Sequence, residues 1–235
     1  MASKKKTKQE EANTVLENPE VLAERLGRTE QFIEDNKNLV LGVLVGLIVV
    51  VAGIFGYRYY IGQQNDIAQS NLFQAIYYFE ADSLSLALNG DGNDLGFLDI
   101  ADDYSGTDAA NLAHYYAGVS LLKQGQYADA VDHLESFSSN DLLIQAKAFC
   151  LIGDAHMELG MFDDAADYYT KAAGYKANEQ FSPDYLMKAG LAFEKADDFK
   201  SAKEAYDEVV ETYENSTSVA EARKRSAWLA QKIDN

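Results

Sequence analysis

The sequence GVSLLKQGQYADAVDHL, at residues 118–134, recurs twice more as GDAHMELGMFDDAADYY at 153–169 and GLAFEKADDFKSAKEAY at 190–206. The three units align without a gap, and their starts lie 35 and then 37 residues apart. A period near 34 residues, with small and aromatic residues at these positions, is typical of the tetratricopeptide repeat. One antiparallel helix pair cannot bury its apolar face alone, so the pattern predicts a stack of such pairs.

The register predicts how each helix pair closes. We expect tight turns at Gly125, Gly160 and Asp197. Each unit also places one glycine on its first helix, where a side chain would hold the second helix away; these are Gly118, Gly153 and Gly190. We expect alanines of the second helix to meet them, namely Ala130, Ala165 and Ala202.

The flanks complete the expected repeat domain. Residues 65–103 resemble a degenerate first unit, and residues 219–233 predict a C-terminal capping helix with a basic, solvated outer face. Ser182-Pro183-Asp184 predicts a capped helix start with a first-turn proline, and Ser218 with Glu221 has the spacing of a capping box. An unrelated helical bundle is the alternative.

A 19-residue stretch without any charge, residues 39–57, predicts one transmembrane helix. Eight of the twenty Lys and Arg residues lie at or before Arg58, and the next basic residue is Lys123. The positive-inside rule therefore predicts a partly disordered cytoplasmic head at 1–38, a span at 39–61 and a periplasmic repeat domain at 62–235, with the chain in the bacterial inner membrane. A buried soluble helix and a cytosolic repeat domain are the alternatives.

The predicted fold is thus all-α. It consists of a single N-terminal transmembrane helix, a tetratricopeptide-type α-solenoid of three to four helix pairs, and a C-terminal capping helix. Four glycines share one face of the span and predict a surface for packing another helix. They are Gly42, Gly46, Gly53 and Gly56.

Composition argues against several classes of function. The formal net charge of −18 disfavours a nucleic-acid binder, and a single cysteine, Cys150, leaves no partner for a disulfide or a thiolate zinc site. The three histidines lack metal-ligand spacing. Residues 89–94 resemble a calcium loop in composition only, since the fifth position holds Leu95 and the twelfth Asp102. We therefore expect no enzyme activity, no cofactor, no metal and no small-molecule substrate.

The expected function is protein binding in the groove that first helices of these repeats line. By register, this predicts a protein-binding groove with apolar, methionine and charged side chains. Its residues are Tyr115, Val119, Leu122, Lys147, Asp154, Met157, Met187, Leu191 and Glu194.

Several strings carry a family resemblance: Ala87-Leu88-Asn89-Gly90-Asp91-Gly92, Gly96-Phe97-Leu98, and the stretch from Asn111 to Gly118. With the Lys-rich head, the single span and the acidic repeats, the chain resembles the YfgM-like ancillary subunits of the bacterial Sec translocon, Bacteroidota type. The resemblance implies Sec translocon subunits and a membrane-anchored periplasmic prolyl-isomerase chaperone as partners, and a role in handling exported proteins. A tetratricopeptide adaptor of a regulatory or other complex is the second hypothesis, and an enzyme is the third.

Overall fold

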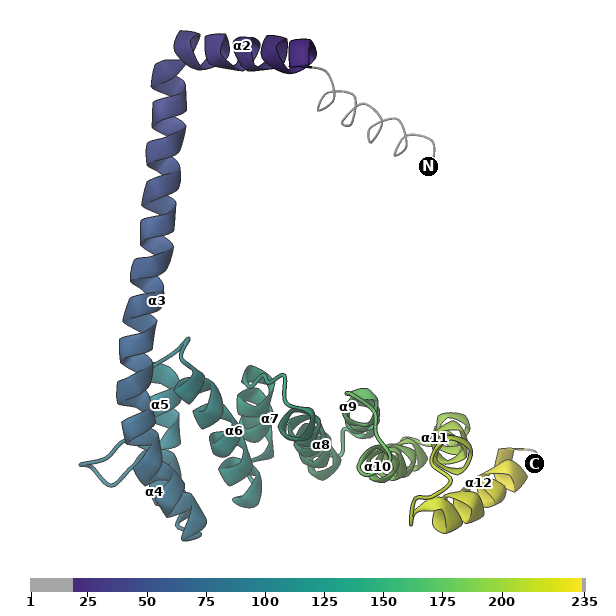
Figure 1. Cartoon of the computed structure of the whole chain (residues 1–235). Coiled ribbons are helices and arrows are strands. Elements are labelled where there is room, and N and C mark those ends of the chain that lie inside the picture. The colour runs from purple at the N-terminus through teal and green to yellow at the C-terminus, as the bar shows by residue number, and fades with distance from the viewer. Residues whose placement is uncertain (1–18, 234–235) are drawn as a thin grey trace. The chain divides into compact units, whose positions relative to one another are not determined.

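The computed structural model describes residues 19–233, which contain eleven α-helices and no strand (Figure 1). The all-α prediction is therefore confirmed for this part of the chain. The contacts divide the chain into two compact units, residues 1–60 and 61–235. The Lys-rich segment at residues 1–13 lies outside the described residues.

The first unit contains α2 (Pro19–Asp35) and the beginning of α3 (Lys37–Glu80). Helix α3 is 44 residues long and includes an 18-residue window with a mean hydropathy of 2.9, none of which is buried. The apolar side chains of this window are exposed; Ile48 is 64% exposed and Phe55 is 70% exposed. By length and composition, this helix is able to cross a membrane.

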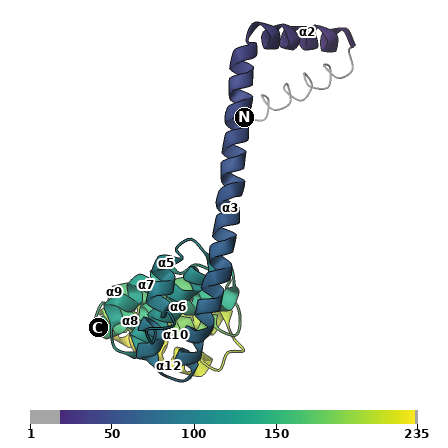
Figure 2. The same ribbon diagram turned by 90° about the vertical axis from the view of Figure 1, so that its left-hand side faces the viewer.

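The second unit begins within α3 and continues through nine more helices. They are α4 (Leu84–Asn89), α5 (Phe97–Asp103), α6 (Asp108–Lys123), α7 (Tyr127–Ser136), α8 (Leu142–Leu159), α9 (Phe162–Gly174), α10 (Ser182–Lys195), α11 (Phe199–Thr212) and α12 (Val219–Ile233). From α5 onward each helix contacts the next along the chain. In the view of Figure 2, α5, α7 and α9 lie on one side of the stack and α6, α8 and α10 on the other, the two-layer arrangement of a helical solenoid.

The three predicted turns fall where the repeat register places them. Gly125 has φ +77° and Gly160 has φ +74°, a left-handed conformation that glycine adopts without steric cost. Asp197 takes the equivalent place in the third unit with φ +61°. Aspartate tolerates this region better than most residues, because its short polar side chain bonds locally.

The glycines on the first helices do permit close approach of the second helices, and side chains larger than the predicted alanines lie nearest to them. A Cβ added to Gly118 would lie 2.5 Å from Cγ of Leu134, and one added to Gly153 would lie 2.7 Å from the ring of Tyr169. At Gly190 the ring of Tyr206 is nearest. Ala130 does meet Gly118, since its carbonyl oxygen lies 3.1 Å from the added Cβ, but at all three glycines the nearest atoms belong to a larger side chain one turn further along the second helix.

Two predicted helix starts use other contacts. Helix α10 does begin at Ser182 with a proline in its first turn, but Phe181 occupies the N-cap position. The Ser182 hydroxyl is buried and donates to the carbonyl oxygen of Ala173. The Ser218 hydroxyl donates to Asp184 at 2.8 Å, and Glu221 pairs with Arg225. Both serines thus tie neighbouring segments together.

The degenerate first unit is built from the end of α3 and from α4 and α5. Ala68, Leu72 and Ala75 face its core, together with the fully buried Phe97 and Ile100. Helix α3 runs without a break from its apolar part into this unit and ends at Glu80. Ile67 points away from the buried face of the helix and is 52% exposed.

The polar loop after α4 is a turn stabilised by its own aspartate. Oδ1 of Asp91 accepts hydrogen bonds from the backbone N–H groups of Asn93 and Asp94, and Oδ2 accepts from the Tyr78 hydroxyl at 2.8 Å. These bonds lower the pKa of the Asp91 carboxyl, with the Asp94 backbone N–H contributing most. Both oxygens are used within the turn, which disfavours the calcium alternative.

Candidate functional site

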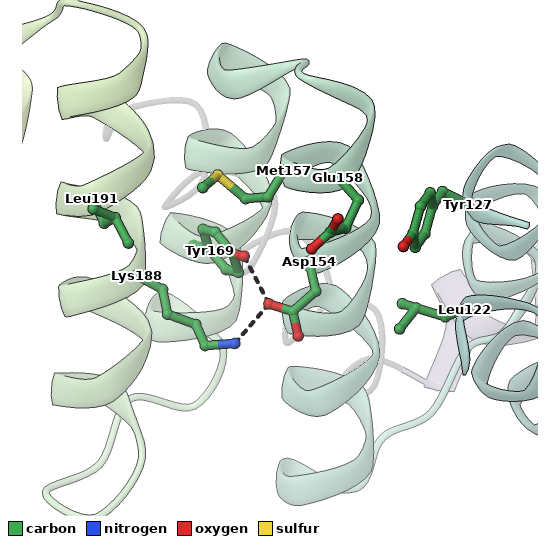
Figure 3. Close-up of a pocket in the computed structure, with 8 residues that line it drawn as sticks. All are labelled: Leu122, Tyr127, Asp154, Met157, Glu158, Tyr169, Lys188 and Leu191. Carbon is green, nitrogen blue, oxygen red and sulfur yellow. Dashed lines mark hydrogen bonds and ion pairs between the residues drawn. The ribbon is translucent and has the colours of Figure 1, made fainter. Parts of the chain in front are cut away.

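A cavity of about 450 Å³ opens on the face of the second unit that α8 and α10 line (Figure 3). Its walls come from the end of α6, the start of α7, the second half of α8, the middle of α9 and the middle of α10. We call it the groove. Its lining residues are Leu122, Tyr127, Asp154, Met157, Glu158, Tyr169, Lys188 and Leu191.

The floor of the groove is a hydrogen-bonded cluster of three side chains. Oδ1 of Asp154 accepts from the Tyr169 hydroxyl at 2.7 Å and from Nζ of Lys188 at 2.6 Å (Figure 3). The cluster joins α8, α9 and α10, so it fixes the spacing of two successive repeat units. Lys188 Nζ also lies 5.3 Å from the centre of the Tyr169 ring, a favourable cation–π distance.

The electrostatics of this cluster keep the Tyr169 phenol protonated and Lys188 charged. Burial raises the pKa of the Tyr169 phenol, and the hydrogen bond to Asp154 raises it further, so the phenol remains a donor. Burial is the largest influence on Lys188 and lowers its pKa, but the hydrogen bond to Asp154 and the other nearby groups together raise the net pKa above its ordinary value. The cluster is therefore an ion pair between Lys188 and Asp154, with the Tyr169 phenol bonded to the same carboxylate oxygen.

The position of Tyr169 follows from the repeat itself. Gly153 precedes Asp154 on α8 and leaves room for the Tyr169 ring, which is 4% exposed. The hydroxyl then emerges beside the carboxylate. The third unit repeats this arrangement, since the Tyr206 ring lies against Gly190 and its hydroxyl donates to Glu194 at 2.6 Å.

The structure brings four of the nine predicted groove residues to the groove: Leu122, Asp154, Met157 and Leu191. Tyr115 and Val119 instead pack against the core that α7 and α8 share, and Met187 packs against the C-terminal core. Lys147 is exposed and outside the cavity. Whether any of these residues binds a partner stays a prediction.

Glu194 was predicted to be available for a partner but is used inside the chain. Its Oε1 accepts from the Tyr206 hydroxyl and from Nη1 of Arg225, the latter at 2.9 Å, and its side chain is only 17% exposed. Arg225 belongs to the capping helix α12, whose basic side chains were expected to be solvated. Lys232 of the same helix covers the Phe199 ring, with Nζ 3.5 Å from the ring centre. The capping helix is thus fastened partly through its basic residues.

Sequence reasoning missed four lining residues: Tyr127, Glu158, Tyr169 and Lys188. Helical spacing was an available signal, since Glu158 is four residues after Asp154 and Lys188 is three before Leu191, and such pairs share a helix face. The two tyrosines stand at aromatic positions of the repeat. A tyrosine hydroxyl usually finds a polar partner when its ring is buried, so these hydroxyls pointed toward a polar neighbour.

The histidines are less scattered than their sequence spacing suggested. Nδ1 of His114 on α6 and Nδ1 of His133 on α7 are 3.0 Å apart, a hydrogen bond that one neutral ring donates to the other. Burial lowers the pKa of both, and for His114 the neighbouring His133 adds to this. His156 is buried elsewhere, stacked on the Tyr168 ring at 5.5 Å between centroids. Within residues 19–233 no group of three or more potential metal ligands occurs.

The four glycines predicted to form a helix-packing face lie on α3, in its apolar part. A Cβ added to Gly42, Gly46, Gly53 or Gly56 would meet no atom within 4 Å. The face is therefore open, and its role in packing against another helix stays a prediction.

One protein-family model matches the sequence, over residues 65–227: T7SS, ESX-1 secretion system protein EccA1, N-terminal domain. No curated protein matches. The matched range covers the repeats from the second half of α3 to α12, including the groove.

This match overturns the family resemblance inferred from the sequence strings. The matching family is named for type VII secretion, so the assignment to the ancillary Sec translocon subunits was wrong, as was the export function beside the Sec translocon. The expected Sec and prolyl-isomerase partners and the chaperone role gain no support, and neither does the regulatory adaptor. The strings that carried the resemblance are short and lie in α4 and the loop after it, at the start of α5 and in α6, so they cover few positions of the repeat domain. Residues 65–227 form a tetratricopeptide-like helical repeat domain, and the chain belongs to the T7SS, ESX-1 secretion system protein EccA1, N-terminal domain family.

Proposed function

We propose that this chain is a membrane-anchored, protein-binding subunit of a secretion system of the type VII class. Its groove binds a segment of another component of the secretion system or of a secreted protein, and the chain catalyses no reaction. The family match supports the secretion context. The single observation that carries the binding role is the groove itself, a cavity of about 450 Å³ with both apolar and charged side chains on rigid helices.

We further propose that α3 crosses the bacterial inner membrane once, with the N-terminus cytoplasmic and the repeat domain periplasmic. The apolar side chains of α3 support this, since leaving so many exposed to water costs about 25 cal/mol per Å² of apolar surface. Leu39, Ile48 and Phe55 are 61%, 64% and 70% exposed. The distribution of Lys and Arg supports the orientation.

Site-directed photocrosslinking in native membranes tests the binding role. A photoreactive amino acid replaces Leu191, which is 38% exposed in the groove, and, as a matched control, Lys200, whose side chain is 82% exposed on α11. We expect the Leu191 position to capture a protein of the same secretion system and the Lys200 position not to. Equal capture at both positions, or capture at neither, would refute groove binding.

Thiol labelling tests the membrane topology. In a Cys150→Ala background, single cysteines replace Glu30 on α2 and Asn140 before α8, both exposed. A membrane-impermeant maleimide should label the Asn140 position in cells with a permeabilised outer envelope and the Glu30 position only after lysis. The reverse pattern would place the repeat domain in the cytosol.

A further inference from the structure

We propose that the groove recognises a lysine or arginine side chain of its partner, flanked by apolar side chains, and that Glu158 is the carboxylate that holds it. This inference rests on the proposed function, because it names the chemistry of the segment that the groove takes. It does not depend on which secreted or structural protein supplies that segment.

The charges inside the groove are unequal. Two carboxylates, Asp154 and Glu158, face one ammonium group, Lys188 (Figure 3). The ammonium is matched, since it lies 2.6 Å from Oδ1 of Asp154. Within residues 19–233 Glu158 has no recorded hydrogen bond or ion pair, and it is exposed. The groove thus carries one negative charge that the chain itself leaves without a counter-charge.

The position of Glu158 suits the recognition of a cation. It lies one helical turn beyond Asp154 on α8, so the two carboxylates are neighbours on the same face. A cation at Glu158 also feels Asp154, while Lys188 is held at the opposite side of that carboxylate (Figure 3). An acidic side chain at the same place would be repelled by Glu158.

The field of the whole repeat unit acts in the same direction. Residues 61–235 contain 30 Asp and Glu against 12 Lys and Arg, so the net charge of −18 belongs entirely to this unit, and residues 1–60 are balanced at eight of each. Such a field draws positively charged segments toward the surface and raises their association rate. A basic segment is therefore favoured before any contact forms.

Apolar side chains surround the carboxylate. Leu122 and Tyr127 line one side of the groove, and Met157 and Leu191 line the other (Figure 3). Leu191 is 38% exposed, and methionine adapts its shape to different apolar partners. These surfaces accommodate leucine, methionine or phenylalanine next to the basic residue, and the long methylene stem of lysine or arginine packs along them while its charge reaches Glu158.

The test compares peptides that differ only at one side chain. Fluorescent peptides of about twelve residues carry leucines on either side of a central lysine, norleucine or glutamate, and bind the full chain in a mild non-ionic detergent. Norleucine keeps the methylene stem of lysine and removes the charge. We expect the lysine peptide to bind about five-fold more tightly than the norleucine peptide, as for a partly exposed ion pair. The glutamate peptide should bind most weakly.

The variant Glu158→Gln should abolish the difference between the lysine and norleucine peptides and leave the norleucine affinity unchanged. Glu208→Gln, an exposed change on α11 outside the groove, is the matched control and should preserve the difference. Equal binding of lysine and norleucine peptides to the unaltered chain, or an undiminished difference in Glu158→Gln, would overturn the inference.

A second measurement separates failure of the inference from failure of the proposed function. The partner segment captured through position 191 is sequenced, and we expect a lysine or arginine among the residues next to the crosslink. Capture that weakens with Glu158→Gln and is unchanged in Glu208→Gln supports the inference. Capture of segments without a basic residue, unaffected by Glu158→Gln, leaves the binding function intact and refutes the inference. Capture of nothing at position 191, together with no peptide binding, refutes both.

Discussion

Replacing Gly153 by alanine should destabilise the repeat unit, although alanine is the better helix former. The added Cβ would lie 2.7, 2.8 and 3.1 Å from three atoms of the Tyr169 ring, distances at which either α8 or the ring must shift. The ring is 4% exposed and its hydroxyl is bonded to Asp154, so it has little freedom to move. Overpacking a tight core costs roughly 1–3 kcal/mol. Alanine regains about 1 kcal/mol in helix propensity.

The net loss is therefore up to about 2 kcal/mol, which lowers the melting temperature by up to roughly 8 °C for a domain of this size. Circular dichroism at the helical band, followed during heating and in urea, measures it. Gly174→Ala at the end of α9 is the control, because a Cβ there meets nothing within 4 Å, and it should be neutral or stabilising.

A double-mutant cycle measures how much of the cost of Gly153→Ala comes from the Tyr169 ring. In Tyr169→Ala the ring that blocks the new methyl group is gone, so adding Gly153→Ala should cost much less than it does in the unaltered chain. If the costs of the two changes simply add, the close approach of Tyr169 to Gly153 is not what requires the glycine. If Gly153→Ala is as stable as Gly174→Ala, the reasoning fails outright.

Three further predictions concern other contacts. Folding lowers the pKa values of His114 and His133, so their contribution to stability is present above the unfolded pKa of about 6.5 and is lost as the pH falls below that value. Melting temperatures measured from pH 7.5 to 5.5 should therefore fall. Replacing both histidines by glutamine should make this fall smaller. Glu194→Ala should loosen α12, because it removes the acceptor that Arg225 and the Tyr206 hydroxyl share, at a cost of roughly 1–3 kcal/mol. Glu194→Gln keeps an acceptor oxygen and should cost less. Amide hydrogen exchange in α12 should be faster in the alanine variant, and equal exchange in both variants would contradict this. Cys150 is 1% exposed, and burial raises the pKa of its thiol. A disulfide reagent at pH 8 should therefore react with it only as the chain unfolds. Rapid labelling of the native chain would show instead that the second unit opens.

The parts of the fold that were predictable from sequence depend on backbone geometry. Gly125 and Gly160 sit at turns that need positive φ, and the spacing between the units fixed which helix pairs with which. These signals are local, so one sequence suffices to read them.

The parts that could not be predicted depend on contacts between side chains of different helices. The sequence register placed alanines opposite the glycines, but Tyr169 and Tyr206 are long enough to reach these glycines from further along the helix. Glu194 shares a helix face with Leu191, yet Arg225 lies 31 residues away in sequence and takes its carboxylate. No helical period encodes such a contact, and the same holds for the pairing of His114 with His133.

The family assignment failed for a related reason. The strings from Ala87 to Gly92 and from Asn111 to Gly118 lie in and around α4 and α6, where alanines and glycines are selected by packing. Short sequence matches in such helices indicate the repeat architecture and not the family. The family match over residues 65–227 draws on many more positions and points to a different secretion system.

The boundary between the two units falls at residues 60 and 61, inside α3 and not in a loop. Residues 60 and 61 belong to one continuous helix, so a protease that cuts flexible loops has no loop to cleave between the two units. A recombinant fragment that starts at Ile61 would create a new helix end with unsatisfied amide groups and a partial positive charge. Asn65, whose side chain accepts from the backbone N–H of Ala109, would then sit in the fraying first turn. A soluble fragment should instead begin several residues upstream, with an added serine or aspartate cap.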